Sequence, residues 1–143
     1  MEEIEEEDWE VNDQEAEKRY KERLNYQGLL MQRINSIMIA IDQGYNPYDN
    51  TNSLLSILIP EIKGPIEGEI ELAKKERDEK LNKIHEQMKL QQPLTIPMKK
   101  AFNRKIIETN QNYAWKVVNL VINTLHDMGM LLEEERRLDE GGY

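Results

Sequence analysis

Apolar residues recur at alternating intervals of four and three along residues 20–45, and this spacing limits the fold more than any other feature. A heptad repeat places such residues on one face of a helix, which must pack against a partner. Gln27 is the one polar member of the repeat, and Leu30 and Ile37 widen the apolar face. Asn12 or Asp13 can cap the start and Gly44 can end the helix, so we expect a helix over 13–43. The repeat comprises Tyr20, Leu24, Gln27, Met31, Ile34, Met38, Ile41 and Tyr45.

Three further helices are expected from the rest of the chain. Asn52 or Ser53 precedes the apolar run LLSILI, which predicts a short buried helix. Pro65 is placed to begin a third helix, which Pro93 ends. In this helix the charged stretch KKERDEK is expected to be solvated or covered by another subunit. A fourth helix is predicted from about 95 to 138, interrupted at most at Gly129, and its two apolar faces favour a central position.

These elements predict an all-α protein that resembles a four-helix bundle, with one short helix, long first and last helices and acidic terminal tails. Short connections favour antiparallel neighbours, and there is no internal repeat. The run LLSILI could also form a buried strand, but no other strand is visible to pair with it, so a helix is favoured. We expect an acidic N-terminal arm at 1–12, a helical bundle at 13–138 and a C-terminal tail at 139–143.

Charge is distributed unevenly along the chain. Residues 1–17 contain ten acids and no base, residues 133–143 have a net charge of −3, and residues 18–132 have a net charge of +4. No apolar run is long enough to span a membrane, and the acidic start is unlike a secretory signal. We therefore expect an intracellular protein, or a virion protein if it is viral, and not a secreted disulfide protein.

The residues that usually carry chemistry are not arranged for it. The sequence has no cysteine, and neither His85 nor His126 has the Glu-x-x-His spacing of di-iron bundles. Asp42 and Glu108 are the only carboxylates near strongly apolar stretches, and both are expected at a helix end or on the surface. The stretch GPIEG lacks the spacing of a phosphate-binding loop. We expect no enzyme activity, no metal and no cofactor.

Two clusters are candidates for binding instead. The first is basic and surrounds Phe102 at the start of the last helix, where positive charge opposes the helix dipole; the alternative is a solvated face with Phe102 in the core. The second is the acidic arm, in which Trp9 could anchor an interface or could simply be a tail aromatic. The candidate interaction residues are Glu5, Glu6, Glu7, Asp8 and Trp9 in the arm and Lys99, Lys100, Arg104 and Lys105 in the basic cluster.

In size, in its Ile/Lys/Glu-rich composition, in its lack of cysteine and in its expected four helices, the chain resembles small helical-bundle proteins of archaeal viruses. Those families include coat proteins and a related inhibitor of the host RNA polymerase. The resemblance implies a structural or inhibitory role but assigns no role to any residue.

Three functions remain open from the sequence. The first is a structural protein, such as a virion coat or filament subunit, that associates with itself through helical faces and terminal arms. The second is an acidic mimic of nucleic acid that occupies the basic channel of an enzyme such as RNA polymerase. The third is an accessory subunit that binds nucleic acid through the basic body of the chain.

Overall fold

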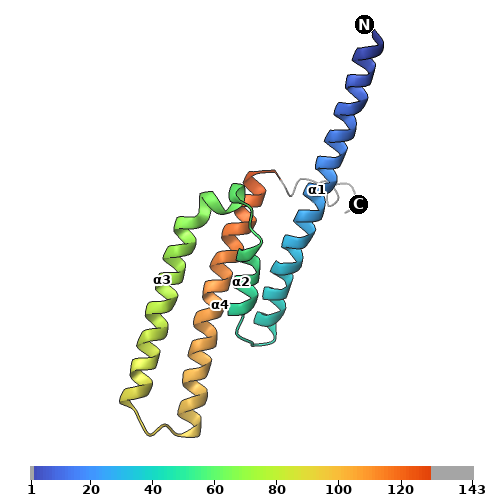
Figure 1. Ribbon diagram of the computed structural model, residues 1–143. Helices are drawn as coiled ribbons and strands as arrows, with labels where there is room; N and C mark the ends of the chain where they lie inside the picture. The colour runs from blue at the N-terminus through green and yellow to red at the C-terminus, as the bar shows by residue number, and fades with distance from the viewer. Residues whose placement is uncertain (1, 130–143) are drawn as a thin grey trace, which may run out of the picture.

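The computed structural model describes residues 2–129, with side chains from residue 13 onward, and its helices form the all-α, bundle-like fold that the sequence predicts. The described part contains four helices and no strand. As Figure 1 shows, consecutive helices run in opposite directions, and the short second helix lies between α1 and α4. The helices are α1 (Glu2–Asp42), α2 (Tyr48–Ser56), α3 (Pro60–Leu90) and α4 (Ile96–Asp127).

Helix α1 is longer than the sequence predicts because it begins at Glu2 rather than near residue 13. Neither glycine nor proline occurs before Gly28, and glutamates are good helix formers that the dipole favours at the N-terminus. Asn12 and Asp13 therefore lie inside the helix. The predicted end is confirmed, because Gly44 has a φ of 75° and Tyr45 N donates to Ala40 O at 2.9 Å.

Helix α2 begins four residues before the predicted cap at Asn52. Its N-cap residue is Pro47, and the amide of Tyr48 donates to the side-chain oxygen of Asn46 at 3.0 Å. Thr51 is fully buried, and its hydroxyl donates a hydrogen bond to Pro47 O. Because this polar group has a partner, its burial destabilises the core little. Tyr48, the first residue of α2, packs against the hydrophobic core.

Helix α3 begins at Pro60, and Pro65, predicted as its start, lies inside it. Pro65 is the sixth residue of α3, so it removes one backbone hydrogen bond and its ring crowds the carbonyl of Glu61. Ile62 and Ile66 on either side of it are 0% and 5% exposed, so burial of this turn offsets that loss.

Helix α4 starts at the predicted cap, where Met98 N donates to Thr95 Oγ1 at 3.3 Å. It ends at Asp127 rather than near 138, because Gly129 adopts a φ of 70° and its amide donates to His126 O. Residues 130–138 and the predicted tail at 139–143 lie outside the described residues.

The core lies where α1 and α2 cover the upper half of the α3–α4 pair in Figure 1. The predicted heptad face of α1 packs there, but the most buried members are the two that widen it, Leu30 and Ile37, each 0% exposed. The predicted central position of α4 is confirmed, since it contacts all three other helices. Its buried apolar residues are Phe102, Tyr113, Ala114, Val117, Val118, Val121 and Leu125.

A hydroxyl bridge holds α1 to the connection between α2 and α3. Tyr26 Oη donates to Ile57 O at 2.8 Å and accepts from Ile59 N at 3.0 Å. Burial raises the pKa of the Tyr26 phenol above its ordinary value of 10.0, while its backbone contact at Ile59 acts in the opposite direction. Tyr26 is also the first half-buried residue of α1 when the helix is followed from residue 13.

Candidate functional site

The helices are staggered, and each end of the molecule is built from only part of the bundle. Every residue of 13–25 is exposed, and Figure 1 shows the first half of α1 extending beyond the other helices. At the other end α3 and α4 continue past the turn after α1, where Gln111 Nε2 donates to Tyr45 O at 3.4 Å. We call residues 2–25 the α1 overhang and residues 78–110 the hairpin end.

These two ends carry opposite charge. The α1 overhang contains eleven acids and four bases, a net charge of −7, whereas the hairpin end contains four acids and seven bases, a net charge of +3. Because the two ends lie at opposite extremes of the molecule in Figure 1, the charges cannot neutralise each other within one chain. The molecule therefore has a charge asymmetry along its long axis, which can steer partners.

The predicted basic cluster is exposed on the first turns of α4. Phe102 is 6% exposed and Lys105 Nζ lies 5.6 Å from the centroid of its ring, so Phe102 is a core residue that also faces a cation. The described structure thus has the solvated basic face that the sequence left open as the alternative. All four cations, Lys99, Lys100, Arg104 and Lys105, are available to a partner.

Two of these cations line a groove that sequence reasoning missed. Lys100, Arg104 and Ile107 follow one another along α4 in this groove, Glu108 adds one acid to it, and Gly44, just after α1, completes its lining. The groove lies where α1 stops and α4 continues. Its signal in the sequence is the spacing of 100, 104, 107 and 111, which places these residues on one helical face.

The acidic candidates Glu5, Glu6, Glu7 and Asp8 and the aromatic candidate Trp9 lie on α1 at the far end of the molecule from this groove. Their side chains lie outside the described residues. The backbone there is helical and continuous with the bundle.

A buried cation in the core was not expected. Arg77 belongs to the stretch predicted to be solvated, yet it is 9% exposed, so that expectation is wrong at this position. Its guanidinium lies 3.9 Å from the centroid of the Tyr48 ring and 5.3 Å from that of Tyr113, and its Nε donates to Asp78 at 3.0 Å. Ile70, Ala73 and Arg77 are three and four residues apart and lie on the buried face of α3. Arg77 can occupy this core position because its long side chain has an apolar stem.

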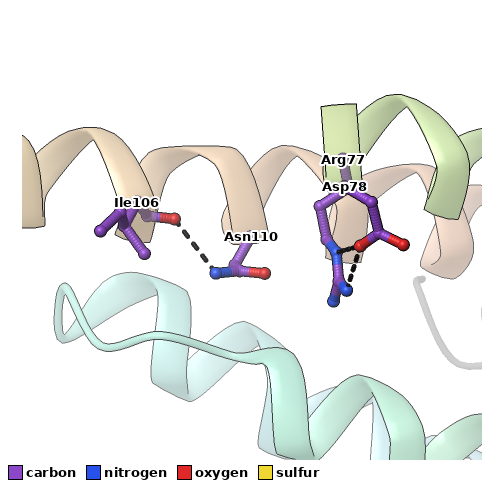
Figure 2. Close-up of polar contacts among 4 residues, drawn as sticks. All are labelled: Arg77, Asp78, Ile106 and Asn110. Carbon is purple, nitrogen blue, oxygen red and sulfur yellow. Dashed lines mark hydrogen bonds and ion pairs between the residues drawn. The ribbon is translucent and has the colours of Figure 1, made fainter. Parts of the chain in front are cut away.

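Figure 2 draws Arg77 and also Asn110, which lies on α4 three residues before Tyr113. Asn110 is 4% exposed, and its Nδ2 donates to Ile106 O at 3.1 Å, whereas its Oδ1 has no hydrogen-bond partner in the described part of the chain. Burial raises the pKa of the neighbouring Tyr113 phenol above 10.0, although the Arg77 charge opposes the rise. The contacts of Arg77 with the two rings stabilise the packing of α2, α3 and α4, whereas the unpaired Asn110 Oδ1 opposes it.

The remaining titratable candidates from the sequence lie on the surface. His85 and His126 are exposed, and so are Asp42 and Glu108. Within residues 13–129, whose side chains the structure describes, no three His, Cys, Asp or Glu side chains are grouped as a metal site would require. On the outer face of α3 and α4, Lys116 Nζ donates to Glu76 Oε2 at 2.8 Å and lowers the pKa of that carboxyl.

Among the described helices, none is long and apolar enough to cross a lipid bilayer. Comparison with models of protein families, with curated proteins and with solved structures found no match for the chain.

Proposed function

We propose that this chain is a non-enzymatic structural protein that assembles with copies of itself, as the subunit of a filament or a virion coat. The observation that carries the proposal is the staggered bundle, whose two incomplete ends have opposite charge. Opposite charges on different ends of identical molecules attract one copy to the next and disfavour like ends.

The α1 overhang also supports association. Helices of globular proteins gain most of their stability from packing, yet residues 13–25 bury no side chain in the described structure. Tyr20 and Leu24 continue the apolar heptad face of the core into this region and are 42% and 38% exposed. A second copy that covers this face would bury them.

Light scattering of the purified protein tests the proposal. At low salt and rising protein concentration the mass should exceed the 16.9 kDa of one chain, and it should fall toward that value as salt screens the ends. A mass of one chain at every protein and salt concentration would refute self-assembly.

Two substitutions separate charge from anchoring in the same assay. Trp9→Ala should weaken association more than Glu5→Gln, because a buried interfacial tryptophan contributes about 2 kcal/mol or more whereas one exposed charge pair contributes about 0–1 kcal/mol. Deletion of residues 2–12 should weaken it most. Equal behaviour of all three variants and the unaltered chain would show that the first residues only aid solubility.

A second candidate function is inhibition of an enzyme with a basic channel, and the observation that favours it is the density of acids on one projecting helix. Residues 2–17 contain ten acids and no base. Such a helix resembles a phosphate backbone in its charge density, so it would compete with nucleic acid in a salt-dependent way. Competition with DNA for a polymerase, by a protein that stays monomeric, would favour this candidate over assembly.

A further inference from the structure

We propose that the α1 overhang of one copy lies along α4 in the hairpin end of the next copy, in line with that copy's own α1. This inference rests on the proposed self-assembly and specifies its contact. The occupant of the groove at Lys100 and Arg104 is thus a second copy of the chain, joined head to tail.

The face of α4 that receives the helix is continuous but changes character halfway. Its upper half is buried in the core, where α2 lies between α4 and α1, whereas its lower half is exposed or half-buried and extends beyond the end of α1. The upper residues are Ala114, Val118, Val121 and Leu125, and the lower ones are Lys100, Arg104, Ile107 and Gln111, with the single acid Glu108 beside them in the same groove. One face of α4 is thus covered within its own chain in its upper half and left uncovered below the end of α1.

The face of α1 changes character in the matching way. Gln27 and Ile34 are buried in the core, and seven residues before Gln27 the face becomes exposed at Tyr20 and then acidic at Asp13. Glu17, one turn after Asp13, is also exposed and acidic. In the sequence, positions at intervals of seven read Glu6, Asp13, Tyr20, Gln27, Ile34 and Ile41.

The apolar half of α1 therefore matches the apolar half of α4, and the acidic half of α1 is complementary in charge to the basic half of α4. Within one chain only the apolar halves meet, since the acidic and basic halves lie at opposite ends of the molecule (Figure 1). A neighbour displaced along the long axis brings the acidic half of its α1 to the basic half of α4. Its helix would then run antiparallel to α4, as α1 already does within the chain.

The lengths also agree. At ~1.5 Å per residue the acidic segment 2–17 spans about 24 Å, and residues 96–110 of α4 span about 22 Å. Carboxylates placed there would meet Lys100 and Arg104 in charge-assisted hydrogen bonds, near the positive N-terminal end of α4. Since the contact joins different surfaces of the two copies and leaves a free end on each, it produces open filaments.

Charge reversal on each side tests the contact. The seat variant carries Lys100→Glu and Arg104→Glu, and the arm variant carries Asp13→Lys and Glu17→Lys. All four residues are exposed, so circular dichroism and thermal unfolding should match those of the unaltered chain. Matched controls reverse two exposed charges outside both proposed surfaces, Lys74→Glu with Lys75→Glu and Glu67→Lys with Glu71→Lys.

Size-exclusion chromatography with light scattering then gives the mass of each variant. We expect the seat variant and the arm variant each to lose association by about tenfold or more, because like charges then face each other, while the controls associate as the unaltered chain does. An equimolar mixture of seat and arm variants should recover association, since each supplies the charge that the other needs.

Other outcomes would contradict either the proposed contact or the proposed function. If the unaltered chain associates but the seat variant associates equally well, the proposed contact is wrong and self-assembly stands. If the unaltered chain never associates, the proposed function itself is wrong. A mass that stops at two copies at every concentration would overturn the head-to-tail arrangement, and loss of duplex DNA binding in the seat variant with self-association unchanged would assign the groove to nucleic acid.

Discussion

Arg77 joins the packing of three helices, and Arg77→Ala should lower the free energy of unfolding by about 3 kcal/mol. The guanidinium stacks 3.9 Å from the Tyr48 ring centroid, and its side chain is 9% exposed. A desolvated cation–π contact contributes about 2 kcal/mol, and loss of the two methylenes beyond Cβ removes about 1.6 kcal/mol. The bond to half-exposed Asp78 adds about 0–1 kcal/mol, while relief of the buried charge returns about 1 kcal/mol.

Urea or thermal unfolding followed by circular dichroism measures this loss, which for a chain of this size corresponds to a drop in Tm of about 10 °C. Arg77→Met keeps the apolar stem and removes the charge, so it should remain within about 1 kcal/mol of the unaltered chain. Lys75→Ala, an exposed neighbour on the same helix, should change stability by less than about 0.5 kcal/mol. The reasoning would be refuted if Arg77→Ala matched Lys75→Ala, or if Arg77→Met were as damaging as Arg77→Ala.

Three further variants test the core and the titratable groups. Ile34→Asp places an unpaired charge at a site that is 3% exposed and should cost about 4 kcal/mol or more; a cooperative unfolding transition at unchanged urea concentration would contradict this. Tyr26→Phe should cost about 1 kcal/mol through its two lost hydrogen bonds. Because the folded pKa values of Tyr26 and Tyr113 are raised, the folded state keeps protons that the unfolded state releases, so stability should be complete below pH 10 and fall as pH rises above it, less steeply in Tyr26→Phe. Replacement of exposed His85 and His126 together by Gln should leave stability and assembly nearly unchanged; loss of a function in the folded double variant would revive an acid–base or metal role.

The sequence by itself determined that the chain is helical, because the heptad spacing at 20–45 and the scarcity of glycine and proline leave few alternatives. It also determined the glycine at the end of α1 and the threonine cap of α4, since both depend on local backbone geometry. The charge of each segment and the identities of the basic residues around Phe102 were equally available from the sequence.

Tertiary structure decided what local rules could not. Pro65 could have begun a helix, but burial of Ile62 moved the start of α3 to Pro60. Arg77 appeared solvated within a run of charges, and only the rings of Tyr48 and Tyr113, distant in sequence, made its burial favourable.

The stagger of the helices is the clearest case. Helix lengths can be read approximately from a sequence, but the axial position of one helix against another depends on which side chains interlock. That position leaves Lys100 and Arg104 in a groove below Gly44 and leaves residues 13–25 exposed at the opposite end. Charge along a chain is a property of sequence, whereas its separation between two ends of a molecule arises only when packing fixes where each helix begins and ends in space.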